Sequence, residues 1–304
     1  MALYDTYLKV QDEVLQRLGW SGTARRNLVK DWINKGGYRI YKDWRHAPWR
    51  KKFGSFLTFA PYSTGTVSSS GATITGVGTT FTAAHVGRKF AQALGSPYFE
   101  VATRTDGTEI TIDQSWPFTA LSGSTYIIYK DVFSLASDCQ TLLRDQVTLH
   151  DSNGHKMGSL SVVQGLEDTD LPTGTGRPED LILREPDSSG NVQVQVWPRV
   201  PDQVYVIRYG YIFGWTELSD NTDVPAIPSR HGELLVLAAC ATAGQHPEFR
   251  GSNLLSNFTA LYQDELRLAK DDTRGSPNAI PASTYDGRQG SKSRYPFPFP
   301  LPNS

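Results

Sequence analysis

Few residues in this chain have the types and spacing that metal binding or cofactor chemistry needs. Among its six histidines, His150 and His155 flank a turn and lie closest together in sequence. No cysteine joins them, and their spacing fits no zinc-binding pattern. Glu179 and Asp180 are adjacent carboxylates, but neighbours on a strand point to opposite faces of a sheet. We therefore expect no metal site and no bound cofactor.

Two glycine-rich segments suggest phosphate binding at first sight. The first, Gly76-Val77-Gly78-Thr79-Thr80, lacks the lysine of a phosphate-binding loop and leads into no clear helix, so a hairpin turn is the better prediction. The second, residues 172–177, is followed by Pro178 and predicts a loop. The Gly-x-Ser-x-Gly elbow of serine hydrolases is absent. These patterns predict that the chain is not an enzyme.

The side chains best suited to binding lie near the N-terminus. Residues 1–52 carry 12 Lys or Arg against 5 Asp or Glu, a balance of +7, whereas residues 53–304 carry 18 against 26, a balance of −8. Arginine, lysine, tyrosine and tryptophan interleave over residues 25–52, a mixture that suits a protein interface or nucleic acid. No nucleic-acid motif accompanies the charge, which favours a protein partner. The candidate contact residues in this block are Arg25, Arg26, Lys30, Arg39, Trp44, Trp49 and Arg50.

Helices are predicted at both ends of the chain. Apolar spacing predicts an amphipathic helix over residues 4–19 and a second helix that starts with Thr23 as its cap and runs to about Trp44. Gly36-Gly37 interrupts the second helix, and the pair marks either a kink or a close helix contact. Two more helices are predicted over residues 229–244 and 252–270.

Strands are predicted between these helical segments. Residues 64–130 form a small all-β unit in which β-branched residues alternate with glycine-rich turns. A second β section spans residues 132–215, and Asn153-Gly154 predicts a tight turn within it. Residues 192–198 and 203–213 are predicted to pair as a hairpin.

The C-terminus changes character again. Residues 295–302 read Tyr-Pro-Phe-Pro-Phe-Pro-Leu-Pro, an alternation that cannot form a core and favours an extended backbone. We expect an arm that orders on a neighbouring subunit, with Tyr295, Phe297 and Phe299 as contacts; the alternative is a plain disordered tail.

Together these elements predict an α+β fold. A helical bundle built from the N- and C-terminal helices is expected to carry antiparallel β sections, a small inserted all-β module and the extended arm. The expected domains are residues 1–60, 61–131, 132–272 and 273–304, of which 61–131 is the inserted module. The chain has 38% hydrophobic residues, two cysteines and no apolar run of membrane-spanning length, so neither a disulfide framework nor a membrane partner is expected.

Several segments resemble the head–tail adaptor (connector, or neck) proteins of tailed bacteriophages. Those segments, in order along the chain, are Leu15-Gln16-Arg17-Leu18-Gly19, Val29-Lys30-Asp31-Trp32-Ile33-Asn34, the glycine- and threonine-rich stretch 65–90, Val196-Trp197-Pro198-Arg199-Val200-Pro201-Asp202, and the helical segments 225–242 and 262–272. Their order is a stronger signal than any one of them. The resemblance covers most of residues 5–272 and leaves residues 273–304 outside.

This resemblance implies a structural protein of the virion neck, made in the host cytoplasm. Such proteins form a ring, commonly of twelve copies, beneath the portal protein; the ring continues the DNA channel and receives tail or nozzle proteins. The acidic balance of residues 53–304 suits a channel through which double-stranded DNA passes without specific binding. Two alternatives stay open. One is a tail-fibre or host-recognition subunit, and the other is a nucleic-acid-binding protein that uses residues 25–52.

Overall fold

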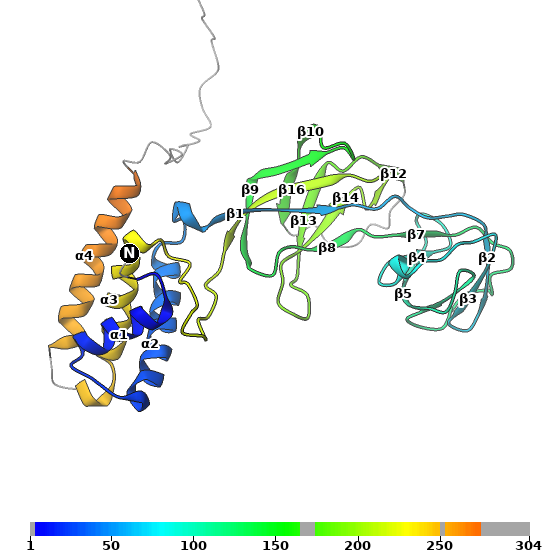
Figure 1. Cartoon of the computed structure of the whole chain (residues 1–304). Helices are drawn as coiled ribbons and strands as arrows, with labels where there is room; N and C mark the ends of the chain where they lie inside the picture. The colour runs from blue at the N-terminus through cyan, green and yellow to red at the C-terminus, as the bar shows by residue number, and fades with distance from the viewer. Residues whose placement is uncertain (1–3, 165–173, 250–252, 275–304) are drawn as a thin grey trace, which may run out of the picture.

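The chain is mostly β. The computed structural model describes residues 4–164, 174–249 and 253–274. These residues form sixteen β-strands in four sheets and four α-helices (Figure 1). The predicted α+β fold based on a helical bundle is therefore wrong. The physical reason is that all sixteen described strands lie between residue 51 and residue 213 and bury side chains within and between sheets, so the sheets carry most of the structure.

The helices form a layer at one end of the molecule (Figure 1). The α-helices are α1 (Tyr7–Arg17), α2 (Thr23–Asp43), α3 (Gly232–Ala243) and α4 (Leu254–Arg274). Short 3-10 helices cover Pro48–Arg50, Ala83–His85, Ser229–His231 and Pro247–Phe249. Helix α3 packs against α1, α2 and α4 and is buried along almost its whole length, as expected of a helix that is apolar on every side.

The glycine pair of α2 marks a close helix contact, one of the two expected alternatives. A Cβ atom on Gly36 would lie 3.0 Å from the backbone nitrogen of Ala239 in α3. A Cβ atom on Gly37 would overlap the ring of Trp215. Helix α2 continues through both glycines, so their function is to let α3 and an aromatic ring approach its backbone.

Three sheets form the central β region beside the helices. The first has the order β1-β16-β9-β10, with β1 (Lys51–Leu57), β16 (Val206–Phe213), β9 (Cys139–His150) and β10 (Lys156–Ser159). The second has the order β11-β13-β14-β8, with β11 (Ser161–Gln164), β13 (Asp180–Arg184), β14 (Gln193–Trp197) and β8 (Val132–Ser134). The third pairs β12 (Thr175–Gly176) with β15 (Val200–Pro201). The helices share one apolar core with these sheets.

Strand pairing confirms one predicted turn and contradicts one predicted hairpin. Strands β9 and β10 pair antiparallel around the turn that contains Asn153-Gly154, which confirms the predicted turn. Strands β14 and β16, predicted to pair with each other, lie in different sheets. Both strands are largely buried, and each finds two other partners, so the short Pro- and Asp-containing connection crosses between sheets instead of folding back.

A six-stranded sheet lies at the end of the molecule opposite the helices (Figure 1). Its order is β2-β3-β6-β5-β4-β7, with β2 (Thr66–Ser70), β3 (Thr73–Val77), β6 (Glu109–Ile112), β5 (Tyr98–Arg104), β4 (Lys89–Ala91) and β7 (Ile127–Tyr129). We call this sheet and its loops the inserted unit. It has its own aromatic core, which includes Phe81, Phe90, Trp116 and Tyr126. Gly76 lies inside β3, so the predicted hairpin turn at Gly76–Thr80 is wrong, and the β2–β3 turn is made at Gly71.

Candidate assembly interface

Arg50, a predicted contact residue, lies inside the protein with 0% of its surface exposed. Its guanidinium donates hydrogen bonds to the backbone oxygens of Tyr41 (2.6 Å), Arg45 (3.1 Å) and Phe213 (2.9 Å) and to the side-chain oxygen of Gln140 (2.5 Å). It therefore ties the end of α2 to β9 and β16. Burial lowers the pKa of Arg50, although an arginine keeps its proton in proteins. This residue holds the chain together and is not available to a partner.

The two tryptophans of the same segment also face inward. Trp44 is buried, and its ring contacts those of Trp49, with centroids 6.1 Å apart, and His231, with centroids 5.5 Å apart. Trp49 is half-buried and packs on Tyr41 at 5.4 Å. Trp44, Trp49 and Arg50 thus join the helical layer to the central sheets, a use that their types alone did not reveal.

Arg25 and Arg26 lie on the surface, where each already has a partner within the chain. Arg25 forms a long ion pair with Glu248 (3.9 Å) and lies 4.5 Å from the ring centre of Trp20. Arg26 pairs with Asp12 at 2.8 Å. Exposed pairs of this kind contribute little to stability, but they neutralise the charge that the sequence places here.

Lys30 and Arg39 are likewise engaged. The Lys30 ammonium donates to the backbone oxygen of Ser219 at 3.3 Å. Arg39 lies 3.7 Å from Asp43 and 4.5 Å from the ring centre of Tyr262, between α2 and α4. The four basic side chains Arg25, Arg26, Lys30 and Arg39 thus all have contacts inside the chain. The other predicted contacts, Tyr295, Phe297 and Phe299, lie outside the described residues.

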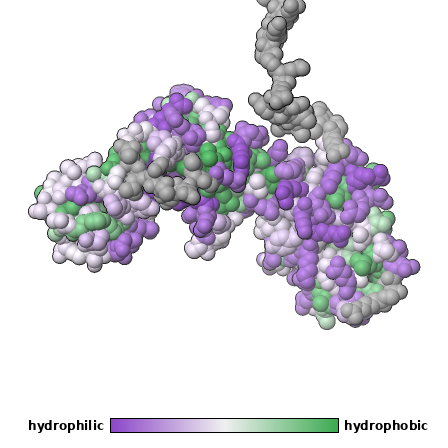
Figure 2. Space-filling model, turned by 180° about the vertical axis from the view of Figure 1, so that it is seen from behind, coloured by the Kyte–Doolittle hydropathy of each residue, from purple (hydrophilic) through white to green (hydrophobic). Residues whose placement is uncertain are grey.

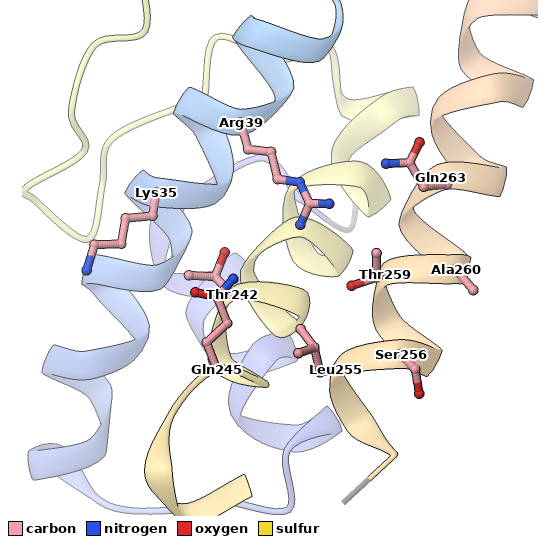
Figure 3. A pocket seen from close by; sticks show the side chains of 9 residues that line it. All are labelled: Lys35, Arg39, Thr242, Gln245, Leu255, Ser256, Thr259, Ala260 and Gln263. Carbon is pink, nitrogen blue, oxygen red and sulfur yellow. The ribbon is translucent and has the colours of Figure 1, made fainter. Parts of the chain in front are cut away.

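A groove crosses the helical layer beside Arg39 (Figure 3). It lies over α3, between α2 and α4, and has a volume of about 940 Å³. The residues that line it are Lys35, Arg39, Thr242, Gln245, Leu255, Ser256, Thr259, Ala260 and Gln263. Five of these residues carry amide or hydroxyl groups, and Lys35 and Arg39 stand along one wall, but most of the surface that lines the groove is apolar. The groove therefore suits an amphipathic segment.

The outer side of α4 carries apolar side chains that the sequence reasoning missed. Leu261 and Leu268 are 52% and 56% exposed, and they lie seven residues apart on one helix face beside Asp264 and Asp271. The buried stripe of α4 runs through Tyr262 and Leu266 instead. The missed signal was present in the sequence, since two leucines at a spacing of seven fall off the predicted core stripe.

The outer side of α2 carries a second, different face. Leu28 and Tyr38 are exposed there, with Lys35 and Lys42 at intervals that share the same side of the helix. Helices α2 and α4 flank α3, so the two faces lie on different sides of the helical layer (Figure 1). One face combines apolar residues with two lysines, of which Lys35 pairs with Asp31 at 2.6 Å, and the other combines leucines with aspartates. Seen from behind, the molecule shows such apolar patches as separate areas on a largely polar surface (Figure 2).

The inserted unit has a depression of its own, of about 530 Å³. Trp116 and the exposed Phe118 form its aromatic wall, with ring centroids 5.5 Å apart. Gln92, Ser96 and Ser122 supply polar groups around it. An aromatic wall with amide and hydroxyl groups at its rim is an arrangement that can hold an amphipathic small molecule.

A buried ion network joins the inserted unit to the central sheets. The Asp131 carboxylate accepts hydrogen bonds from Lys89 (3.0 Å), Gln195 (2.7 Å) and Arg199 (2.8 Å). Asp131 and Arg199 are 1% and 2% exposed, respectively. Burial alone would raise the pKa of Asp131, but the two cations outweigh this and hold it below its ordinary value of 3.8. The network fixes β4 of the inserted unit against β14 and β15.

The two histidines beside the β9–β10 turn have structural partners. His150 is buried, and its ring bonds to the hydroxyl of Thr148 and the backbone oxygen of Gly154, both at 3.0 Å. His155 is exposed and lies 3.1 Å from Asp151. Both rings stabilise the turn, and their geometry offers no site for a substrate between them.

Further comparison adds no assignment. Within residues 4–164, 174–249 and 253–274, no group of three His, Cys, Asp or Glu side chains is placed to hold a metal ion. No helix in that part of the chain is long and apolar enough to cross a bilayer. A scan against models of protein families finds no match, and a search of curated proteins finds no relative.

Proposed function

We propose that this chain is a structural subunit of the neck of a tailed bacteriophage, where copies assemble side by side into a ring between the portal protein and the tail. The ring would continue the DNA channel, and tail or nozzle proteins would bind below it. The sequence-level resemblance to head–tail adaptors supports this proposal, since the order of helical, β, inserted β and helical segments follows that family. The resemblance implies twelve copies.

The observation that carries the proposal is the pair of unlike faces on α2 and α4. A contact between two different surfaces of the same protein repeats from copy to copy, and it closes into a ring when the rotation permits. Leu28 and Tyr38 on one side complement Leu261 and Leu268 on the other in hydrophobicity, and Lys42 is opposite in charge to Asp264; Lys35 already pairs with Asp31 on its own helix at 2.6 Å. Apolar side chains at such positions gain most when a neighbour covers them.

The N-terminal basic block supports this function more than it supports nucleic-acid binding. Trp44 and Arg50 are buried, and Arg25, Arg26 and Arg39 bind partners within the chain. Few of the interleaved groups are left to stack on bases or neutralise phosphates. We expect the protein to bind double-stranded DNA weakly and with a shallow dependence on salt, which fluorescence anisotropy with a labelled duplex measures.

The direct test is cryo-electron microscopy of the protein mixed with its portal, or of the virion neck. A ring of this chain between portal and tail is the expected result. Its location at a fibre or tail tip, or its absence from the particle, would contradict the proposal.

A paired variant tests the interface itself. Replacing Leu261 and Leu268 together by aspartate places two charges on the apolar face of α4, and we expect it to abolish assembly while the monomer keeps its fold. Gln263→Glu is the matched control, because it adds negative charge to the groove side of the same helix. Mass measurement by analytical ultracentrifugation with circular dichroism separates loss of assembly from unfolding. Normal assembly of the double variant would exclude this face.

A second candidate function is host recognition by the inserted unit, favoured by the depression at Trp116 and Phe118. Its aromatic wall and polar rim suit a saccharide, whose apolar face stacks on a ring while its hydroxyls meet Gln92 and Ser122. Binding of the protein to host cells, lost in Phe118→Ala and kept in Val77→Ala on another exposed part of the unit, would favour this candidate.

A further inference from the structure

Strand β1 has a free edge. It pairs antiparallel with β16 and, within the described part of the chain, with no other strand. The amide of Thr58, just beyond β1, donates to the oxygen of Tyr205 at 2.9 Å, so it points toward β16. Because successive residues of a strand alternate in direction, the backbone groups of Phe53, Ser55 and Leu57 point the other way, toward the free edge. Unpaired edges of this kind are templates for another strand.

The same three residues form an uncovered apolar face. Phe53 is 77% exposed and Leu57 is 51% exposed, and Ser55 lies between them. Phe56, which alternates with them, turns inward, where its ring stacks on Phe133 of β8 with centroids 4.7 Å apart. The edge of β1 therefore offers unpaired hydrogen-bonding groups and exposed apolar side chains on the same residues. An added strand can pair with these backbone groups and also cover these side chains if the residues that hydrogen-bond to β1 are themselves apolar.

The C-terminal sequence has that pattern. Proline occupies positions 296, 298, 300 and 302, and the residues between them are Tyr295, Phe297, Phe299 and Leu301. Proline lacks an amide hydrogen, so a strand built from this segment can donate from one edge and is blocked on the other. Each residue that precedes a proline is also restricted to extended conformations, which lowers the entropy lost on pairing.

Antiparallel pairing would bring these features together. Residues directly opposite each other in an antiparallel pair place their side chains on the same face of the sheet. If the donors at 295, 297 and 299 bond to the edge of β1, their aromatic rings lie beside Phe53 and Leu57. The prolines then face away from β1 and end the sheet.

The length of the intervening chain favours a neighbouring copy as the source. Helix α4 packs against the end of α2, the helix that precedes β1 in the chain, since Lys270 donates to the backbone oxygen of Asp43 at 2.9 Å. A connection of about 4–6 residues is usual between adjacent elements. Residues 275–294 provide 20 residues rich in Gly, Ser and polar side chains. Twenty residues can span at most about 70 Å, a reach suited to the next subunit.

We propose that residues 295–301 of one copy add as an antiparallel strand to the free edge of β1 in the next copy. This inference rests on the proposed side-by-side assembly, and it names the surface that receives the arm. Each subunit then gives an arm to one neighbour and takes an arm from the other, which strengthens a ring without using the faces of α2 and α4.

Cross-linking between differently tagged full-length copies tests the contact. One copy carries Ser55→Cys, the other carries Phe297→Cys, and a short bismaleimide joins them; the native Cys139 and Cys240 are buried and react little. We expect covalent dimers that contain one copy of each kind. Ser122→Cys, in the exposed part of the inserted unit, replaces Ser55→Cys as the matched control and gives none. A chain that carries both substitutions and cross-links only within itself would overturn docking on a neighbour.

The proline pattern provides a second variant. Phe299→Pro removes one donor from the pairing edge, and we expect the cross-link yield between the Ser55→Cys and Phe297→Cys copies to fall about fivefold. Pro298→Ala changes the opposite edge and leaves the yield unchanged. Equal yields in both variants would overturn the strand pairing. Rings without cross-links would refute the docking and leave the proposed function standing. Cross-linked copies that never form a ring on the portal would support the docking and contradict the proposed function.

Discussion

Two contact regions, here called joints, connect the three parts of the molecule. Each joint contains a buried arginine in a different chemical setting. At the joint between helices and central sheets, Arg50 is surrounded by backbone oxygens and by the amide of Gln140, with no carboxylate among its hydrogen-bond acceptors. At the joint between central sheets and inserted unit, Arg199 bonds to the carboxylate of Asp131, which also binds Lys89. The first joint is held by dipoles and the second by charges.

This difference predicts different responses to mutation and to pH. A cation held by carbonyl groups can be replaced by an apolar side chain at the cost of the hydrogen bonds alone, because the desolvated charge leaves with it. A carboxylate shared by two cations cannot be removed so easily, because its loss leaves the cations buried without compensation. A carboxylate also titrates, whereas an arginine does not.

Asp131→Asn is expected to have the largest effect. It keeps the shape of the side chain but leaves Lys89 and Arg199 without their counter-charge, so we expect it to lower the free energy of unfolding by about 3–5 kcal/mol. Urea denaturation measures the loss, and hydrogen exchange should localise it to β4 and β7. A loss below 1 kcal/mol would show that the network contributes little to the joint.

Arg50→Leu should cost less, about 2–3 kcal/mol. The variant leaves the oxygens of Tyr41 and Phe213 without their donor, but it also removes a desolvated cation from the interior. The same denaturation experiment applies, and faster exchange is expected at the end of α2 and along β16. If this variant proved more damaging than Asp131→Asn, the contrast between the two joints would be wrong.

Lowering the pH separates the joints further. The folded-state pKa of Asp131 lies below its ordinary value of 3.8, so its contribution is complete above that pH and is lost as the pH falls through the lower folded value. The difference in unfolding free energy between wild type and Asp131→Asn should therefore shrink as the pH falls below 3.8. The difference for Arg50→Leu should stay constant over the same range. Denaturation curves at a series of pH values compare the two.

Lys89→Gln gives the smallest expected change, about 1 kcal/mol. Lys89 is the more exposed cation of the network, and Asp131 keeps Arg199 and Gln195 when it is replaced. Lys156→Gln, at an exposed position of β10, is the control and should stay within about 0.5 kcal/mol of wild type. Equal losses of unfolding free energy in the two variants would show that Lys89 does not stabilise the network.

Much of the secondary structure could be predicted from local pattern. Thr23 was predicted as the cap of the second helix, and that helix begins at Thr23 with Gly22 as its cap, one residue from the prediction. The turn at Asn153-Gly154 joins β9 and β10. These features depend on periodicity and turn chemistry within a few residues. The hairpin predicted between residues 192–198 and 203–213 was wrong, because pairing depends on partners far away in the chain.

The predicted contact residues show the same contrast between what the local sequence indicates and what distant contacts decide. The sequence showed that Trp44, Trp49 and Arg50 are residues of the kind that interfaces use, but a joint inside one chain uses the same kinds. Leu261 and Leu268 fall off the predicted core stripe of their helix, but only the structure shows that both are exposed. Residue type indicates how strongly a side chain can bind, whereas burial decides whether another molecule can reach it.

The sequence by itself determined where helices, strands and turns alternate, the charge of each segment and the alternation of proline with aromatic residues at the C-terminus. Those properties depend on neighbours along the chain. Only the tertiary structure decided that the fold is mostly β, that Arg50 faces inward, and that β1 keeps a free edge beside Phe53 and Leu57. Sheet order and burial depend on contacts between distant segments, and periodicity within one segment carries no record of which distant segment it meets.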